Sequence, residues 1–575
     1  MQHNEDIAAI FEEIADLLEI TGEQAFRINS YRKAARTLRD LTADIAELAA
    51  AGEHTKLPGI GKSMAAKIEE YLAQKGIDLH SELLESVPAG LPALLEIPGL
   101  GPKRIALAWK ELGIENLAGL KSAIADGRLA TLKGFGPKLV ATIAQGIRFA
   151  EQAAGRTPLG LAWPLARELT AAMAAVPQVG RVEIGGSVRR GCETIGDLDL
   201  LCEAADGGPV IAAFTTLPQV KRVLASGPTK GSIIVDRRDG IEMQVDCRVV
   251  PTESFGAALQ YFTGSKEHNV RLREMAVRHK WKLNEWGLFD GDTRLAGERE
   301  EDIYERLGLP WIPPELREDR GEFETPDLPT VIELKDIRGD LHLHTTESDG
   351  VVTAAEMAAA AEQLGYEYIA ITDHSKSSTI ANGLTVDRMW RQIERLRRLN
   401  GQLKTVTVLV GCECDILADG TLDYPDPLLA ACDFVVASVH TAMRQDPAKL
   451  TARILQAMDS PYVNVIGHPT GRLLGRREAM DFDMSAVIAK AAATHTALEL
   501  NASWQRLDLG DRHLRAAREA GVMICISTDA HSTAQLEQMR YGVTTARRGW
   551  LSAEQVLNTR PLPLVRQWLA KKRPA

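Results

Sequence analysis

The first 155 residues carry apolar side chains at helical spacing, and segments 7–20 and 28–41 predict amphipathic helices. Within this region one pattern recurs three times, as a tight G-x-G turn that opens an apolar helix. Its copies are LPGIGKSMAAKI (57–68), IPGLGPKRIALAW (97–109) and LKGFGPKLVATI (132–143). The pattern predicts an α-helical N-terminal region that contains repeated hairpins.

Short strands replace this pattern after residue 179, with helical stretches between and after them, which predicts an α+β unit over 179–315. The stretch 313–334 is rich in proline and charge, as interdomain linkers are. After residue 337, short apolar strands alternate with helices through almost 240 residues. That alternation predicts an α/β barrel-like domain.

Composition places the chain among globular proteins of several domains. It has 575 residues, 45% hydrophobic and 25% charged, and this length corresponds to about three to five domains. No apolar run approaches the roughly 18 residues that span a bilayer, and the acidic N-terminus is unlike a signal peptide, so no membrane partner is expected. Seven cysteines without a C-x-x-C pair favour free thiols in a reducing cytoplasm.

The net charge of −11 counts against a broad basic surface for nucleic acid. Backbone amides and bound divalent cations also hold phosphates, however, and carboxylates that bind metal add to the acidic excess. Charge alone therefore leaves a nucleic-acid partner open.

Candidate metal ligands follow one apolar strand after another in the C-terminal region. His342 and His344 are two residues apart, so in a strand both imidazoles share one face. Side chains at the carboxyl ends of barrel strands meet at one mouth, and each metal takes four to six ligands. A single histidine after a strand is more often a structural cap, but the repetition favours one centre with several metals. The candidates are His342, His344, Asp349, His374, Glu413, His440, His468, Asp529 and His531.

The motifs DLHLHT, ITDHS, GCECDI, ASVHT, IGHPTG and STDAH resemble those of the PHP (polymerase and histidinol phosphatase) family over about 235 residues. The resemblance implies a distorted (β/α)7 barrel with a trinuclear site that hydrolyses phosphoesters. By motif, the ligands of the family's first metal would be His342, His344, Glu413 and Asp529. Those of the second would be Glu413, His440 and His468, and those of the third Asp349, His374 and His531. Mixed histidine and carboxylate ligands favour Mn²⁺, Zn²⁺ or Fe²⁺ over Mg²⁺, and the sequence leaves these three open.

A second group of acidic residues lies in EIGGSVRRGCETIGDLDLLCE (183–203) and EMQVDCRVV. Asp197 and Asp199 share one face of a strand, and Asp246 comes from another strand. Three converging carboxylates bind the Mg²⁺ or Mn²⁺ ions that phosphoryl transfer requires. A lone G-D-x-D is often only a solvated turn, but here a glycine-rich turn and an arginine precede it and can hold phosphate oxygens. That phosphate-binding group is Gly186, Ser187 and Arg190.

This pattern resembles the nucleotidyltransferase superfamily and, more closely, the family X DNA polymerases, because YFTGSKEHNVRLREMA (261–276) and KLNEWGLF (282–289) follow it. The resemblance implies contacts with the nucleotide sugar, the incoming base and the template strand. The sugar would be contacted by Tyr261, Phe262 and Gly264, the base by Asn269 and the template strand by Arg273. Lys266 departs from the acidic residue of animal polymerase beta, so nucleotide affinity does not carry over. On their own, the two aromatic residues would equally well be core residues of a helix.

The three hairpins resemble helix-hairpin-helix motifs, which hold DNA backbones without reading their sequence. Glycine lets the backbone approach a phosphate, and the following helix N-terminus presents free N–H groups to it. Contacts of this kind reconcile DNA binding with the acidic charge, although one or two copies could equally be tight helix connections. The expected DNA-binding glycines are Gly59, Gly61, Gly99, Gly101, Gly134 and Gly136.

The first hairpin lies in a region that resembles the lyase domain of polymerase beta, through NSYRKAARTL (29–38) and KLPGIGKSMAAKIEEYL (56–72). The motif places Lys67 at that family's Schiff-base lysine. A lysine beside a DNA clamp is more often a phosphate contact, and Ser63 replaces a lysine that supports phosphate binding in the animal enzyme. Deoxyribose-phosphate lyase activity is therefore a hypothesis for this chain.

Together the resemblances cover nearly the whole chain and imply a monomeric, bacterial-type family X DNA polymerase fused to a PHP domain. Its expected parts are a lyase-like domain (1–80), further hairpins (81–156), a polymerase palm with nucleotide-binding subdomain (157–316), a linker (317–336) and the PHP domain (337–575).

The expected activity is the filling of short gaps in gapped or nicked DNA from deoxynucleoside triphosphates, in base-excision repair. The PHP domain would add a Mn²⁺-dependent 3′–5′ exonuclease, with abasic-site endonuclease and 3′-phosphatase as further candidates. Two alternatives remain: a PHP small-molecule phosphatase with a vestigial polymerase region, and a non-enzymatic scaffold that binds DNA ends.

Overall fold

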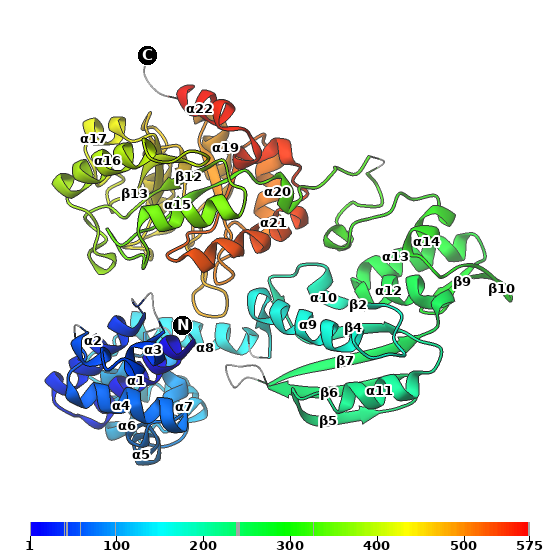
Figure 1. The fold of residues 1–575 in the computed structure, drawn as a ribbon, viewed down its shortest axis with the longest axis horizontal. Coiled ribbons are helices and arrows are strands. Elements are labelled where there is room, and N and C mark those ends of the chain that lie inside the picture. Colours follow the sequence, from blue (N-terminus) through cyan, green and yellow to red (C-terminus); the bar gives the residue numbers. More distant parts are fainter. Residues whose placement is uncertain are drawn as a thin grey trace. The chain divides into compact units, whose positions relative to one another are not determined.

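The structure, a computed structural model, describes residues 2–39, 41, 44–57, 59–97, 99–153, 155–236, 242–325 and 327–572. The chain divides into two compact units. The first contains Met1–Ala154, Asp349–Thr353 and Gly475–Glu478, and the second contains Gly155–Ser348, Ala354–Leu474 and Ala479–Ala575. Figure 1 shows both units and labels many of their elements.

The N-terminal unit is a bundle of short helices, drawn in blue and cyan in Figure 1. It has two apolar cores, and α1 contributes to both: Phe11 and Ile14 lie in the first, Leu17 and Ile20 in the second. The helical character predicted for this region is confirmed. The helices are α1 (Gln2–Thr21), α2 (Ala25–Arg39), α3 (Ile45–Ala50), α4 (Lys62–Gln74), α5 (Asp78–Ser86), α6 (Pro102–Leu112), α7 (Leu117–Ala125) and α8 (Pro137–Ala153).

Each G-x-G turn lies directly before a helix, as the repeat predicts. The first glycine of each turn adopts the left-handed backbone, which a residue with a Cβ atom rarely adopts. The φ angles are +84° at Gly59, +93° at Gly99 and +92° at Gly134. The helices that follow begin at Lys62, Pro102 and Pro137, and proline suits a first helical position because its φ is already helical.

The α+β core is built on a five-stranded sheet in the order β2-β4-β7-β6-β5. The neighbours β4 and β7 run parallel, and the other pairs run antiparallel. Leu169 of α9 and Phe214 of α11 pack with Leu200 and Val245 of the sheet in one apolar core. The elements are β1 (Thr157–Pro158), α9 (Leu159–Ala174), β2 (Val182–Ile184), α10 (Gly186–Arg189), β3 (Thr194–Ile195), β4 (Leu198–Glu203), α11 (Gly207–Thr215), β5 (Val220–Ser226), β6 (Lys230–Asp236) and β7 (Glu242–Val250).

A smaller subdomain follows, with a three-stranded sheet in the order β10-β9-β8. Its core contains Leu272, Leu288 and the fully buried Tyr304. The elements are α12 (Phe255–Thr263), α13 (Lys266–Arg278), β8 (Lys282–Asn284), β9 (Gly287–Asp290), β10 (Thr293–Ala296) and α14 (Glu300–Arg306).

A buried ionic triad connects this subdomain to α10. Arg189 donates hydrogen bonds of 2.7 and 2.8 Å to the two carboxylate oxygens of Glu300, and Arg317 donates one of 2.7 Å to the same group. Burial acts to raise the pKa of Glu300, but the charges and hydrogen bonds of the two guanidinium groups lower it to about 2. Arg317 is fully buried although it lies in the segment that its composition assigns to a linker, so this part of the segment packs against the core.

The C-terminal domain is a barrel of seven parallel strands in chain order, β11 to β17. A parallel bridge between Leu343 and Ala530 joins the ends of the first and last strands, so the sheet nearly closes, and the predicted distorted barrel is confirmed. The strands are β11 (Gly339–Leu343), β12 (Tyr368–Ile371), β13 (Thr407–Asp415), β14 (Phe434–Ser438), β15 (Val465–Ile466), β16 (Ala497–Asn501) and β17 (Ile524–Ser527).

Helices surround these strands in Figure 1, which is why the strands are buried along nearly their whole length. They are α15 (Ala354–Gln363), α16 (Val386–Asn400), α17 (Asp426–Ala431), α18 (Pro447–Ala457), α19 (Met484–Thr494), α20 (Asp511–Glu519), α21 (Met539–Arg548) and α22 (Leu562–Ala570). Among the residues that the structure describes, no helix combines the length and the apolar character needed to cross a membrane.

The triad generates a stability prediction. Glu300→Ala should destabilise the second unit by about 3–5 kcal/mol, because it leaves Arg189 and Arg317 without their buried anion. Thermal unfolding of the full-length protein would show this as a lowered midpoint. Glu301→Ala is the matched control, since the side chain of Glu301 is 51% exposed. Equal midpoints for the two variants would contradict the assigned role of the triad.

Candidate functional site

The nine candidate metal ligands gather at one mouth of the barrel. The strands run parallel, so their carboxyl ends lie together, and the chain becomes polar where each buried strand ends. His342 and His344 lie at the end of β11, Asp349 beyond it, His374 after β12, Glu413 in β13, His440 after β14, His468 after β15, and Asp529 and His531 after β17.

Glu413 lies at the centre of this group. Its carboxylate is 1% exposed and faces a ring nitrogen of each of five histidines. The distances are 3.5 Å to His342, 3.7 Å to His344, 2.8 Å to His374, 3.3 Å to His440 and 3.0 Å to His468. This arrangement suits a carboxylate that bridges metal ions, because each of its oxygens faces several potential ligands.

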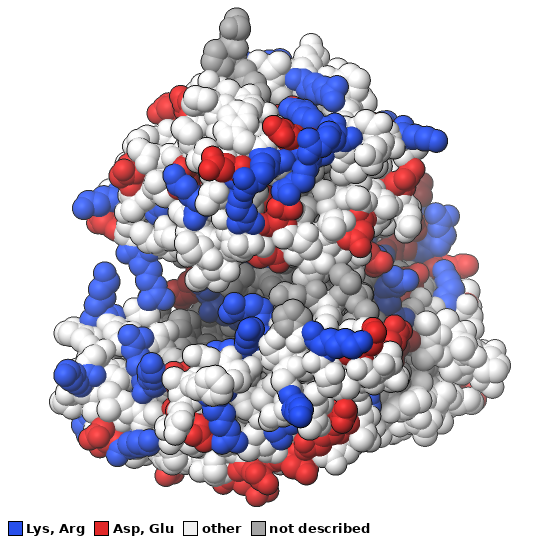
Figure 2. Space-filling view, turned by 60° about the vertical axis from the view of Figure 1, so that its left-hand side comes forward, with Lys and Arg blue, Asp and Glu red and all other residues white. Residues whose placement is uncertain are grey.

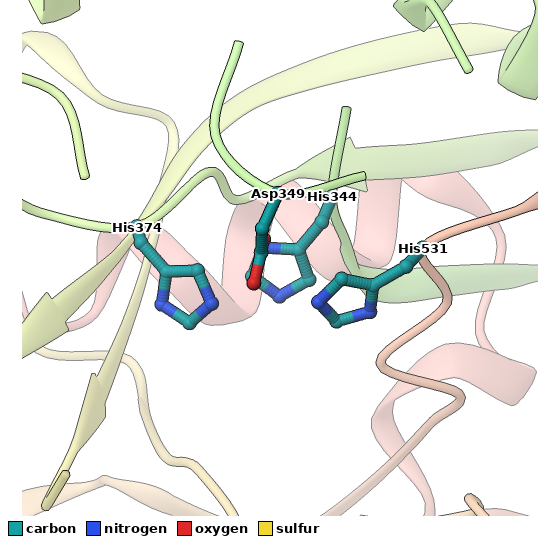
Figure 3. A group of neighbouring side chains, drawn as sticks. All are labelled: His344, Asp349, His374 and His531. Carbon is teal, nitrogen blue, oxygen red and sulfur yellow. The ribbon is translucent and has the colours of Figure 1, made fainter. Parts of the chain in front are cut away.

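Three sets of ligand atoms are compact enough to share an ion, with all atoms of a set within 4.8 Å of one another. They are His344, Asp349, His374 and His531; His342, His344 and Asp529; and His374, Glu413 and His440. Figure 3 shows the first set, in which His344 and Asp349 from the connection after β11 come together with His374 and His531 from two other connections. His468 lies beside the third set, with its Nε2 atom 3.3 Å from Nε2 of His440.

The bonding within the cluster, and the lowered pKa values of Glu413 and His344, fit divalent cations. Glu413 Oε2 and His342 Nε2 are both buried, and among the described residues neither makes a well-aligned hydrogen bond, although ring nitrogens of His374 and His342 lie 2.8 and 3.5 Å from that oxygen. Burial raises the pKa of Glu413, but the charges of His440, His374 and His342 lower it well below its usual range. Burial, together with His531 and His374, lowers the pKa of His344 to about 3, which leaves the neutral ring that binds metal.

Two buried carboxylates contact the Nδ1 atoms of two of the imidazoles, on the side of each ring away from Glu413. Glu499 Oε1 lies 2.7 Å from Nδ1 of His342, and Asp415 Oδ1 lies 2.6 Å from Nδ1 of His440. Glu499 also accepts the backbone N–H of His468 at 2.5 Å. Partners of this kind fix which ring nitrogen faces a metal.

Asp373 and Asn501 support neighbouring parts of the mouth. Asp373 accepts hydrogen bonds from the Thr345 N–H at 2.8 Å and the Ser348 hydroxyl at 2.6 Å, and Asn501 donates to Asp529 at 3.0 Å. Together with Glu499 and Asp415, these residues make four supporting residues that were not among the sequence candidates. Each is a polar residue at or near the end of an apolar strand. They are Asp373 (ITDH), Asp415 (GCECD), Glu499 and Asn501 (ALELN).

The backbone is unusual at two of the candidate ligands. His468 has φ of +26° and Asp529 has φ of +55°, in the left-handed region that residues with a Cβ atom rarely adopt. Conformations of this kind persist where the surrounding structure holds them, and they concentrate at functional sites. Here the hydrogen bonds to Glu499 and from Asn501 hold the two residues.

The three candidate catalytic carboxylates lie on or beside the paired strands β4 and β7. Asp199 and Asp246 are register partners on these parallel neighbours, so their side chains share one face, and the exposed Asp197 directly precedes β4. Burial, followed by the charges of Asp197 and Asp246, raises the pKa of Asp199 to about 7. Bound divalent cations would relieve this repulsion.

Gly186 brings the predicted phosphate-binding turn against this carboxylate group. Its φ is +61°, and a Cβ atom there would lie 2.4 Å from Oδ2 of Asp199. Only glycine fits without a displacement of the carboxylate or the turn. Ser187 follows in α10, and Arg190 caps that helix, so the turn and the carboxylates form one site.

The candidate nucleotide contacts lie around α12 and the start of α13. Gly264 ends α12, and a Cβ atom on it would lie 3.1 Å from the guanidinium of Arg190. Asn269 donates to the Tyr261 carbonyl at 2.7 Å and accepts from Gln260 at 2.6 Å, so its amide is held in one orientation. The Phe262 ring packs edge-on against Tyr261 and lies under the guanidinium of Arg248. Arg273 is exposed on α13, four residues after Asn269.

The second glycine of each hairpin, and the lysine that follows it, are exposed. These glycines are Gly61, Gly101 and Gly136, and the lysines are Lys62, Lys103 and Lys138. The face drawn in Figure 2 shows Lys and Arg interspersed with Asp and Glu. Exposed helix N-termini with an adjacent lysine offer phosphate contacts on such a mixed surface.

Lys67 lines a groove of about 720 Å³ in the N-terminal unit, together with Phe26, Tyr31, Gly59 and Gly61. Its Nζ atom lies 3.6 Å from Glu70. The groove therefore places a lysine, an exposed aromatic ring and the first hairpin together.

A carboxylate-bearing sheet beside a phosphate-binding turn, joined to a barrel with clustered metal ligands, defines a nucleotidyltransferase fused to a phosphoesterase-type domain. The family comparisons agree. Residues 2–77 match a helix-hairpin-helix domain, 91–148 a SAM-like helix-hairpin-helix tandem, 258–318 the DNA polymerase beta thumb and 340–502 the PHP domain.

The whole chain is similar to the DNA polymerase/3′-5′ exonuclease PolX of Bacillus subtilis (strain 168). The two are 40% identical over 575 residues, which cover 99% of this chain and 100% of that relative. The chain therefore belongs to the family X DNA polymerases that carry a C-terminal PHP domain. Membership of this family implies divalent metal ions.

Shorter relatives match part of the chain. A probable phosphatase of Thermoanaerobacter sp. (strain X514) is 27% identical over 245 residues, 41% of this chain and 95% of the relative. A probable phosphatase of Syntrophotalea carbinolica is 29% identical over 229 residues, 38% of this chain and 90% of the relative. Each of these relatives is matched over nearly its whole length.

The central position of Glu413 generates a binding prediction. Glu413→Ala should lower the number of Mn²⁺ ions that the protein retains, because this carboxylate faces five of the candidate ligands. Mass spectrometry of the metal content, after equilibration with Mn²⁺ and gel filtration, measures the loss. Asp419→Ala, which removes an exposed carboxylate on the connection after the same strand, should retain the wild-type content. Equal metal content in both variants would contradict the bridging role.

Proposed function

We propose that this protein fills short gaps in DNA and that it also trims DNA 3′ ends through a 3′–5′ exonuclease activity of its own. One observation carries the proposal: a single chain holds the paired carboxylates of Asp199 and Asp246 and, in a separate barrel, the buried Glu413 cluster. The full-length likeness to a relative named DNA polymerase/3′-5′ exonuclease supports both activities.

In the synthetic site, Asp197, Asp199 and Asp246 would hold Mg²⁺ or Mn²⁺. Ions bound there would activate the primer 3′-hydroxyl for attack and neutralise charge on the triphosphate. Asp246 would orient or deprotonate that hydroxyl, while the turn at Gly186 and Ser187 donates to phosphate oxygens. Lys230, whose Nζ lies 3.0 Å from Asp246, holds that carboxylate in place.

Other residues of the core would select the nucleotide. Tyr261, Phe262 and Gly264 would pack against the sugar, where close contact excludes a ribose 2′-hydroxyl. Asn269 would contact the base, and its fixed amide supports that role because it needs no reordering on binding. The exposed Arg273 would contact the template strand.

In the barrel, the nine ligands would hold up to three ions of Mn²⁺, Zn²⁺ or Fe²⁺. Such ions supply activation of water near neutral pH and neutralise charge on the phosphate. Glu499 and Asp415 would keep the rings of His342 and His440 turned towards them. Abasic-site endonuclease and 3′-phosphatase chemistry would use the same residues, since each breaks a phosphoester bond.

The hairpins would hold the DNA backbone through the exposed amides at their second glycines, without reading sequence. A trimming site beside a filling site suits base-excision repair, in which damaged 3′ ends are removed before extension. All seven cysteines are free thiols, which suits a reducing cytoplasm.

One alternative function is a small-molecule phosphatase, which the likeness to the probable phosphatases favours. A phosphatase of that kind would not require the paired carboxylates of the sheet or the hairpins.

Two single substitutions should separate the activities. On gapped DNA with Mn²⁺ and deoxynucleoside triphosphates, Asp246→Ala should reduce synthesis at least about a hundredfold and spare degradation of 3′ ends, because it removes a ligand of one site only. His344→Ala should do the reverse. Asp236→Ala, which removes an exposed carboxylate of the neighbouring strand, should leave both activities intact.

Gel electrophoresis of end-labelled primers follows both reactions at once. The account of two independent sites is wrong if either substitution abolishes both activities in a folded protein. Hydrolysis of free monophosphates without hydrolysis of DNA 3′ ends would favour the small-molecule phosphatase instead.

Lys67 provides a separate test of lyase activity. Its Nζ would attack the C1′ aldehyde of an abasic site with loss of water, and borohydride would reduce the resulting imine to a stable cross-link. Lys67→Ala should lose this trapped species on denaturing gels, whereas Lys56→Ala, 75% exposed in the wild-type protein, should keep it. Equal trapping by Lys67→Ala and the wild-type protein would remove the hypothesis.

A further inference from the structure

Arg190, the arginine of the proposed phosphate-binding turn, is held by several partners within the second unit. Its Nε donates to Glu318 at 3.1 Å, its Nη1 donates to the Thr263 carbonyl, and its Nη2 lies 3.8 Å from Sγ of Cys192. A guanidinium has five N–H donors, so these contacts leave two for phosphate oxygens. They fix the plane of the fork before any nucleotide arrives.

The barrel domain takes part in this arrangement through Arg548, the last residue of α21. Arg548 Nη1 donates to the Glu318 carboxylate at 2.9 Å and to the backbone carbonyl of Arg190 at 2.8 Å. Its Nη2 donates to Asp511 of α20 at 2.9 Å. The side chain of Arg548 is 6% exposed, so this is a buried ionic contact and not a screened surface pair.

The charges along this chain of contacts alternate. Glu318 lies between Arg190 and Arg548, and Asp511 lies between Arg548 and Arg320, whose Nη1 donates to it at 2.8 Å. Because Glu318 shares its charge between two arginines, it orients Arg190 without neutralising it fully. Arg190 therefore keeps positive charge for a triphosphate.

Close packing at the same place shows that the contact is built into the turn. Gly191 follows Arg190 with φ of +65°, and a Cβ atom on it would lie 2.1 Å from the Thr544 side chain of α21. Glu193, two residues further on, pairs with Arg472 of the barrel. The phosphate-binding turn thus lies directly against the barrel domain on both sides of Gly191.

We propose that Arg548 of the barrel domain is a positioning residue for nucleotide binding by the polymerase core, acting through Glu318 and the backbone of Arg190. This inference rests on the proposed role of Arg190 at the nucleotide phosphates. It makes the affinity of the synthetic site for nucleotide depend on a residue of the nuclease domain.

Arg547 offers a matched control on the same helix. Its Nε donates to Glu315 at 2.6 Å and its Nη1 donates to the Ile332 carbonyl at 3.0 Å. It therefore ties α21 to the connecting segment by contacts like those of Arg548, but it touches neither Glu318 nor Arg190. Arg547→Ala removes an ionic tie of the barrel and leaves the proposed positioning contact in place.

The test measures filling of a one-nucleotide gap by the full-length protein over a range of deoxynucleoside triphosphate concentrations. Arg548→Ala should raise KM for the nucleotide about tenfold, with a smaller effect on kcat, because it removes a buried charge-assisted contact. Arg547→Ala should change KM less than about twofold. Arg190→Ala should raise KM by more than Arg548→Ala, and adding Arg548→Ala to it should have little further effect, since the second residue acts through the first.

Each outcome bears on one claim. Equal KM values for Arg548→Ala and Arg547→Ala, or additive effects in the double variant, would overturn the positioning role. An unchanged KM in Arg190→Ala would instead refute the phosphate-binding role of Arg190. If Arg548→Ala does not fold, as judged by thermal unfolding, Glu318→Gln decides: it keeps the shape of the contact, should raise KM about tenfold, and a wild-type KM would overturn the proposal.

Discussion

The buried carboxylate of Glu413 imposes the central constraint on the barrel. Removing an ion from water costs several kcal/mol, which only opposite charge and hydrogen bonds at close range offset. Parallel strands supply the imidazoles for this, because their carboxyl ends bring residues distant in sequence to one mouth. Glu499 and Asp415 complete the arrangement by holding the outer ring nitrogens of two of these imidazoles. These carboxylates and rings would together hold divalent cations, which would offset the charge of the buried carboxylates.

The same electrostatic problem recurs in the polymerase core on a smaller scale. Asp199 and Asp246 are adjacent on parallel strands, and their repulsion with Asp197 is the kind that bound cations relieve. Around them, arginine–glutamate contacts provide rigidity: Glu300 joins Arg189 to Arg317, and Glu318 joins Arg190 to Arg548. Two consecutive arginines of one turn therefore connect in different directions, the first to the smaller subdomain and the second to the barrel.

Features that follow from local pattern could be predicted from the sequence. The barrel and its nine candidate ligands follow from short apolar strands, most of which lead into a histidine or a carboxylate, and the hairpins follow from their repeat. Features that depend on distant partners could not be predicted. Arg317 lies in a polar, proline-rich stretch, and only the fold reveals its buried partner Glu300. The edge strand β5 carries no clear strand signal in its residues, because most of them are exposed and it lacks the alternation of a half-buried strand.

The central claim is that the Glu413 cluster binds several metal ions at a place separate from the polymerase carboxylates. Anomalous X-ray scattering from crystals of the full-length protein equilibrated with Mn²⁺ tests it most directly. The account predicts at least two anomalous peaks at the barrel mouth. Each peak should lie about 2–2.5 Å from coordinating atoms of Glu413, His344 or His440. An empty barrel mouth in crystals whose Asp199 and Asp246 carry Mn²⁺ would contradict it.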